Sequence, residues 1–126
     1  MSARTRIDAL RTRIPFPYVR YSSEEKEVSA QVVKGIGVLT YLDITNTGAT
    51  PGTVMIFDAD GVPDDGATPV CRIPLPAAGD YPAHASLNTP VPVKLGAVAV
   101  FSLDGDTLEI SEDGVWFYSI DSDEKL

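Results

Sequence analysis

AQVVKGIGVLTYLDITN, residues 30–46, is the stretch that decides the fold of this chain. It is rich in β-branched residues, which favour extended strands because their branched side chains pack well on a pleated surface. Gly35 and Gly37 lie inside it, and glycines within a strand pattern indicate a bulge or a break between two strands. The stretch therefore predicts β-structure with either a bulge or a break between two strands at Gly35 and Gly37.

The same kind of pattern continues toward the C-terminus. Residues 46–52, NTGATPG, have the composition of a turn, and Thr53–Phe57 is a continuous apolar run that predicts a strand buried on both faces. Asp104-Gly105 and Asp113-Gly114 are hairpin signals. Further strands are expected at Pro69–Leu75, Val91–Leu103, Thr107–Ile110 and Val115–Ile120, with a short extended piece around Tyr81–Ala85. Short strands separated by frequent turns predict an all-β fold, an antiparallel β-sandwich or a jelly-roll-like barrel.

Charge divides the chain into three parts. We expect a basic N-terminal arm and linker over residues 1–28, a sandwich domain over 29–120 and an acidic C-terminal tail over 121–126. The first twenty residues carry five arginines against Asp8, a net charge of +4, whereas the remainder carries five basic and seventeen acidic residues, a net charge of −12. A basic arm attached to an acidic domain predicts a protein that binds a partner through one of its surfaces and exposes a different surface to solvent.

The arm has the composition of a protein-docking segment. Ser2 could cap a short helix over Ala3–Arg13, but such a helix is too short to be stable alone in water, and Pro15 and Pro17 would end it. We therefore expect the arm to order against a partner. Nucleic acid is the alternative partner, but the acidic domain would repel a polyanion, so we expect none. The expected docking residues combine arginines with apolar and aromatic side chains: Arg4, Arg6, Ile7, Leu10, Arg11, Arg13, Phe16, Tyr18 and Arg20.

One loop has a weak resemblance to a metal site. Asp58, Asp60 and Asp64 stand at positions 1, 3 and 7 of an acidic loop with Gly61 at position 4, and carboxylates so spaced can wrap a hard cation such as Ca²⁺. The spacing fails the EF-hand pattern, which needs glycine at position 6 and glutamate at position 12. A solvated surface loop is the favoured alternative, and we expect no metal and no cofactor.

The residues needed for catalysis are scarce. His84 is the only histidine, and Cys71, the only cysteine, lies in an apolar run. The chain therefore lacks the side chains needed for a zinc site or for Cys–His or Ser–His–Asp catalysis, and we expect that it is not an enzyme. Trp116, Phe117 and Tyr118 are consecutive, so alternate side chains should face opposite sides of a strand, one side filling the core and the other pairing with a subunit or stacking on a sugar. No apolar run approaches the ~20 residues that span a bilayer, and we expect no membrane partner.

Two segments carry a family resemblance. Residues 37–58, GVLTYLDITNTGATPGTVMIFD, and residues 68–82, TPVCRIPLPAAGDYP, resemble small β-sandwich virion proteins of tailed bacteriophages. In those proteins a strand ending in NTGAT and a GTV strand precede an apolar strand of this type. The similarity covers roughly Gly37–Ser102. The C-terminal part departs from the group, which tends to close with a Gly-rich strand and no acidic tail.

The resemblance implies a capsid decoration, head-fibre, neck or tail accessory protein without catalytic residues. We therefore expect a virion protein that is made in the host cytoplasm and docks on capsid or other virion proteins through its arm. We also expect a homo-oligomer, a trimer or a dimer. A carbohydrate- or host-binding module that uses Trp116–Tyr118 or the Asp58–Asp65 loop is the alternative.

Overall fold

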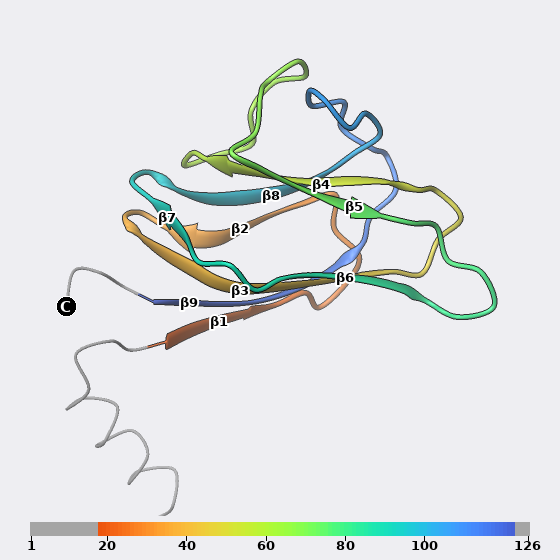
Figure 1. Ribbon diagram of the computed structural model, residues 1–126, viewed down its shortest axis with the longest axis horizontal. Coiled ribbons are helices and arrows are strands. Elements are labelled where there is room, and N and C mark those ends of the chain that lie inside the picture. Colours follow the sequence, from red (N-terminus) through yellow and green to blue (C-terminus); the bar gives the residue numbers. More distant parts are fainter. Residues whose placement is uncertain (1–17, 123–126) are drawn as a thin grey trace, which may run out of the picture.

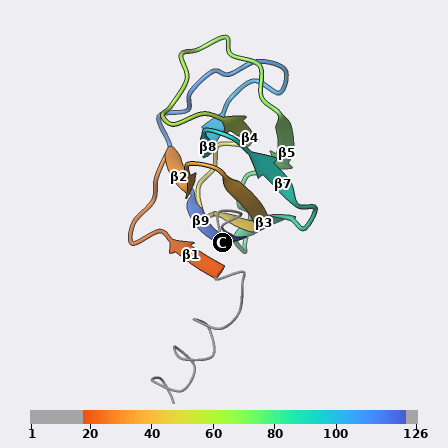
Figure 2. The same ribbon diagram turned by 90° about the vertical axis from the view of Figure 1, so that its left-hand side faces the viewer.

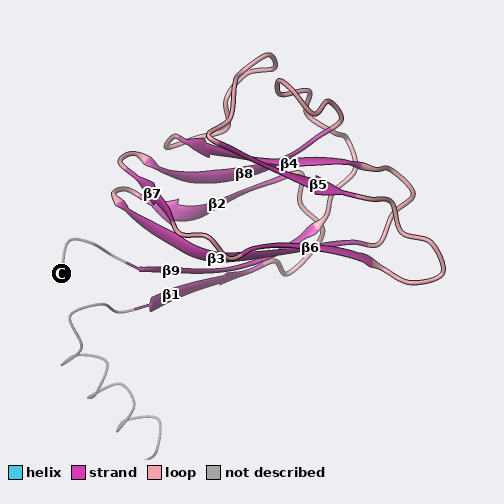
Figure 3. Ribbon diagram, in the orientation of Figure 1, coloured by secondary structure: helices cyan, strands magenta, loops and turns pink. Residues whose placement is uncertain are grey.

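The computed structural model describes residues 18–122, and these form an all-β fold of two antiparallel sheets packed face to face (Figures 1 and 3). The expected β-sandwich is thus confirmed. No helix occurs between Tyr18 and Ser122, so that part of the chain contains no helical membrane span.

Sheet 1 holds the first and the last strands of the described chain. Its order is β1 (Tyr18–Ser22), β9 (Trp116–Ser122), β3 (Gly37–Asn46) and β6 (Ala83–Leu87), and the short β7 (Val91–Val93) also pairs with β3. Sheet 2 has the order β2 (Ser29–Lys34), β8 (Gly96–Ser102), β4 (Gly52–Asp58) and β5 (Cys71–Leu75). In Figure 1 sheet 1 is the lower layer and sheet 2 the upper one.

Of the bulge or break expected at Gly35 and Gly37, the structure has the break, and there the chain passes from one sheet to the other. β2 ends at Lys34 in sheet 2, and β3 begins at Gly37 in sheet 1. Gly35 has a φ of 73°, a left-handed conformation that glycine adopts without steric cost. The glycine-containing stretch thus supplies one strand to each layer of the sandwich.

The main core lies between the sheets. On β3, Leu39, Leu42 and Ile44 are fully buried, and they meet Val54 and Phe101 from sheet 2 in one apolar cluster. Full burial of an aliphatic or aromatic side chain is worth about 1.5–3 kcal/mol. The period of two holds from Leu42 to Ile44, and a register shift between Leu39 and Tyr41 keeps Leu39 on the same inward face.

A second, smaller core lies on the other face of sheet 2. Met55, Phe57, Val98 and Val100 point away from sheet 1 and pack against Leu108. They are covered by residues 59–70 and 103–115, the two long loops at the top of Figure 1. Leu108 ties these loops together, since its N–H donates to Ala67 at 2.9 Å and its carbonyl accepts from Gly66 at 2.7 Å. β4 and β8 are therefore buried on both faces, as the apolar run Thr53–Phe57 predicted.

Three expected boundaries differ from the structure. The sandwich begins at Tyr18 rather than at residue 29, because β1 pairs along its whole length with β9. The strand expected over Val91–Leu103 is divided into β7 and β8, with Lys94 and Leu95 between them. Thr107–Ile110 is not a strand and contributes only a single bridge from Ile110 to Ser102, because its backbone joins the loop that covers sheet 2.

Candidate functional site

The outer surface of sheet 1 is open and carries aromatic and polar side chains together. No described loop crosses it, in contrast to the loop-covered outer surface of sheet 2 (Figure 2). We call this surface the aromatic face. It carries Tyr41, Trp116, Tyr118 and Ile120 together with Arg20, Asp43, Thr45, His84 and Ser86.

Alternation along β9 creates the aromatic part of this face. Phe117 and Ser119 point inward and are buried, while Trp116 and Tyr118 point outward and are partly exposed. The expectation that consecutive aromatics face opposite sides is confirmed. Tyr41, on the neighbouring β3, lies diagonally across from Tyr118, with ring centroids 6.4 Å apart and an interplanar angle of 68°. This edge-to-face arrangement is favourable for aromatic pairs and holds both rings in place.

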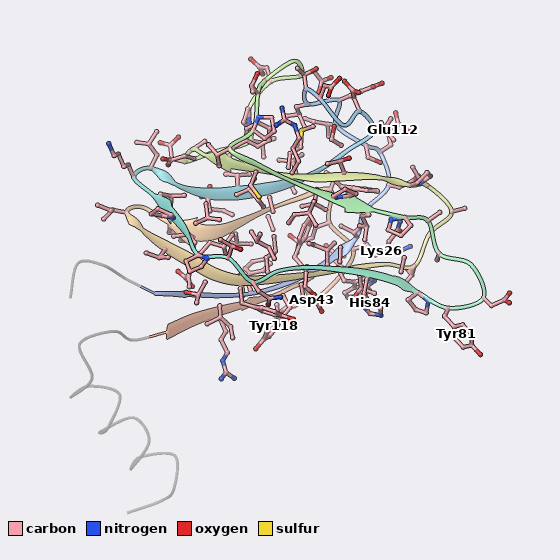
Figure 4. All side chains as sticks on the ribbon, in the orientation of Figure 1. Lys26, Asp43, Tyr81, His84, Glu112 and Tyr118 are labelled. Atoms are coloured by element: carbon pink, nitrogen blue, oxygen red, sulfur yellow. The ribbon has the colours of Figure 1, made fainter. Side chains whose placement is uncertain are left out.

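Polar side chains extend the face across β3 and β6. Asp43 pairs in register with Tyr118 on one side and Ser86 on the other, and the Ser86 hydroxyl donates to Asp43 Oδ1 at 3.3 Å. Thr45 Oγ1 and His84 Nδ1 are 3.0 Å apart. Figure 4 shows Asp43, His84 and Tyr118 pointing away from the sandwich. The face thus offers rings and hydrogen-bonding groups side by side, a composition typical of interfaces with polar molecules or protein surfaces.

The expected docking arm joins the fold at the edge of this face. Seven of its nine expected docking residues, from Arg4 to Phe16, lie outside the described residues. The other two, Tyr18 and Arg20, belong to β1. Arg20 stands opposite Ile120 and is exposed, so its side chain lies on the aromatic face.

A network of partly buried side-chain hydrogen bonds fixes β1 to the chain that follows it. The Tyr21 hydroxyl donates to the Glu27 carboxylate, with its oxygen 2.5 Å from Oε1 and 2.7 Å from Oε2, and the Ser23 hydroxyl donates to Glu27 Oε1 at 2.7 Å. Burial, followed by the hydrogen bond to Glu27, raises the pKa of Tyr21 to about 12. This network anchors the β1–β2 connection.

The acidic loop weighed as a metal site has a structural role at its first residue. Asp58 accepts backbone N–H groups of Lys94, at 3.1 and 3.2 Å, and of Leu95, at 2.9 Å. The hydrogen bond from Leu95 is the main cause that lowers the pKa of Asp58. Asp60 and Asp64 are exposed, and residues 18–122 contain no group of three or more His, Cys, Asp or Glu side chains placed to hold a metal. Asp58 thus secures the β7–β8 connection.

Acidic residues gather on the side away from the aromatic face. Residues 58–70 and 103–115 contain no lysine or arginine and together carry nine carboxylates. In Figure 4 Glu112 lies near the top, whereas Tyr118 and His84 lie beneath sheet 1. The nine are Asp58, Asp60, Asp64, Asp65, Asp104, Asp106, Glu109, Glu112 and Asp113.

Sequence reasoning found the aromatics of β9 but missed the residues beside them. Asp43, Thr45 and Tyr41 occupy alternate positions of a stretch recognised as a strand, so their shared face could have been inferred from the period of two. His84 and Ser86 could not, because pairing β6 with β3 is a long-range choice. Compared with protein-family models, curated proteins and solved structures, the chain has no match.

Proposed function

We propose that this chain is a non-enzymatic structural protein of a tailed-bacteriophage virion, a capsid decoration protein that docks through its basic arm and associates with copies of itself. The proposal rests on the difference between two opposite sides of the molecule, one aromatic and one acidic. β1, which directly follows residues 1–17, lies at the edge of the aromatic face, and the acidic loops lie on the opposite side (Figure 1). Such a molecule can bind through one side while the other remains solvated.

Arginine and aromatic side chains support this choice of docking side. Both residue types are enriched among the side chains that dominate binding energies at protein interfaces. Arg20, Tyr118 and Trp116 lie on the aromatic face, and residues 1–17 precede β1, the edge strand of the same sheet. The arm and the face would therefore contact the same virion surface. The resemblance of residues 37–58 and 68–82 to phage virion proteins supports the choice of a virion surface as the partner.

Immunogold electron microscopy on particles of the phage that encodes this chain tests the proposal. Label distributed over the whole head is the expected result for a decoration protein. Label at one vertex, on head fibres or on the tail would make it a neck, head-fibre or tail accessory protein instead. Particles without label would refute a virion role.

Full-length variants then test the docking side. Replacing Arg4, Arg6, Arg11 and Arg13 by glutamine should abolish addition of the purified protein to particles that lack it, measured by co-sedimentation. Arg72→Gln is the matched control, because Arg72 is exposed and donates to the carbonyl of Asp106 in the acidic loops. Equal loss of binding in both proteins would contradict docking through the arm.

A carbohydrate- or host-binding module is the second candidate, and the aromatic face favours it. Sugars stack on exposed aromatic rings and accept or donate hydrogen bonds beside them, and Trp116, Tyr118, Asp43 and His84 supply both kinds of contact. Binding to a panel of host-surface glycans, lost in Trp116→Ala and kept in the arm variant, would support this function. Absence of binding across the panel by the native protein would count against it.

A further inference from the structure

The four sheet edges of the described sandwich are not equally protected against pairing with another strand. The β5 edge contains Pro74. The opposite edge of sheet 1 from β1 is formed by β6 and β7, which both pair with β3, and β7 contains Pro92. β2 has a register shift between Gln31 and Val33 and ends at Lys34. Prolines, bulges and lysines are the usual devices that blunt an edge. β1 has none of them and pairs with β9 in an unbroken register.

The backbone of β1 can be followed to see which groups face its open edge. The N–H of Ser23 donates to the carbonyl of Phe117 at 2.9 Å, which continues the β1–β9 register. Hydrogen-bonded residues alternate along an antiparallel strand, so Tyr21 also bonds toward β9. Arg20 and Ser22 therefore direct their N–H and C=O groups away from β9. Figure 2 shows β1 at the outer end of its layer, with no other described strand beyond it.

We propose that β1 is a homodimerisation edge, where two copies of this chain pair their β1 strands antiparallel about a two-fold axis at Tyr21. In this register Arg20 of one copy exchanges two backbone hydrogen bonds with Ser22 of the second copy, and the symmetric pair adds two more. The alternative axis at Arg20 would place two guanidinium groups opposite each other, and like charges in that position are destabilising. The inference deepens the self-association included in the proposed function and rests on it.

Charge complementarity favours a second copy as the occupant of this edge. Beside β1 lies an open hollow of about 300 Å³, bounded by Tyr21, Ser22, Glu24, Glu25 and Glu27. The pairing places Arg20 of each copy opposite Ser22 of the other, at the hollow that Glu24 borders. Each copy thus presents positive charge where the other presents carboxylates.

The mass of the purified full-length protein, measured by sedimentation velocity over a range of concentrations, tests the proposal. The native chain should form a species of twice 13.5 kDa. Arg20→Pro should be monomeric at the same concentrations, because it removes an N–H that faces the open edge and none that bonds to β9. At dilutions where the native protein is also monomeric, the two proteins should have the same Tm. A native protein that stays monomeric throughout, or an Arg20→Pro protein that still dimerises, would overturn the assignment to β1.

A charge exchange tests the register. Arg20→Glu and Glu24→Arg should each weaken the dimer at least about tenfold, and the double exchange should restore it. A double variant as weak as the single ones would refute the proposed register. Hydrogen exchange of backbone amides tests which molecule pairs with the β1 edge. Protection of the Ser22 amide should rise with the concentration of this protein. Protection that appears only when a different protein is added would refute pairing with a second copy of this chain. These measurements use the purified protein without virions. A negative result would therefore refute dimerisation through β1 without bearing on docking to a particle.

Discussion

Asn46→Asp should unfold the turn that joins β3 to β4, although the two side chains have nearly the same shape. Asn46 is 1% exposed, and its side-chain nitrogen donates to the carbonyls of Thr50, at 2.8 Å, and Pro76, at 3.0 Å. Its Oδ1 accepts the N–H of Gly48 at 3.0 Å. An aspartate keeps the acceptor but places an oxygen against two carbonyl oxygens, so two hydrogen bonds are lost inside the protein.

The magnitude follows from these contacts. Each lost hydrogen bond costs about 0.5–1.5 kcal/mol, and a buried carbonyl left without a donor adds about 1–3 kcal/mol. Solvent can reach part of the turn after relaxation, so we expect a total loss of about 3–5 kcal/mol. For a domain of this size, such a loss lowers the Tm by roughly 10–20 °C.

The loss should depend on pH. Burial and the facing carbonyls raise the pKa of the new carboxyl group above its value in the unfolded chain, so the protonated form is favoured in the folded state. The deficit against the native protein should therefore be largest at pH 7 and shrink below about pH 4, where the acid can donate one hydrogen bond. Urea unfolding at both pH values measures it, with exposed Asn88→Asp as the control. An Asn46→Asp protein within 1 kcal/mol of the native one at pH 7 would refute the reasoning.

Three further predictions concern β1 and the two cores. Tyr21→Phe should remove a phenol with a pKa of about 12, seen as phenolate absorbance, and the stability that the hydroxyl adds should be present below pH 10 and lost as the pH rises to about 12. Gly96→Ala should cost about 2–4 kcal/mol in urea unfolding, because φ is 135° and a Cβ would lie 2.7 Å from two neighbouring atoms, whereas Gly61→Ala, with open space around it, should be neutral. Phe117→Ala should cost about 3–5 kcal/mol and Trp116→Ala much less, and equal melting temperatures for these two would contradict the assignment of faces.

The strands that could be predicted from sequence are those whose signal is local. β3 and β4 have β-branched or apolar runs of their own, and Gly35 marks the place where the chain changes sheet. β1 could not be predicted, because Pro15 and Pro17 precede it and the residues that make it a strand belong to β9, almost a hundred positions later. Pairing at that distance is a property of the whole fold rather than of a short window.

The candidate site could likewise be predicted from the sequence only in part. The period of two along residues 116–118 is sufficient to assign Trp116 and Tyr118 to one face of β9 and Phe117 to the other. Which face stays open could not be inferred. It depends on the two acidic loops, which cover sheet 2 and leave sheet 1 bare. Loop packing of this kind follows from single contacts, such as those of Leu108, that have no sequence signature.

The contrast between the two outer surfaces has a physical reason. Met55, Phe57 and Val100 on sheet 2 have no polar atoms that could meet water, so loops must cover them, and carboxylates on those loops keep the cover soluble. Trp116 and Tyr118 on sheet 1 combine an apolar ring with a polar group, and such side chains tolerate water yet gain from burial when a partner arrives. An open surface of this composition is stable alone and favourable in contact.

Pairing at β1 would change what that open surface can do. A two-fold axis at Tyr21 runs perpendicular to the sheet, so the aromatic faces of both copies would point the same way and form one continuous surface with two arms. Linked attachment at two points can raise overall affinity by about 10²–10⁴ without any new contact. Doubling the face and the arms would therefore double the surface through which a chain of 126 residues can hold a particle.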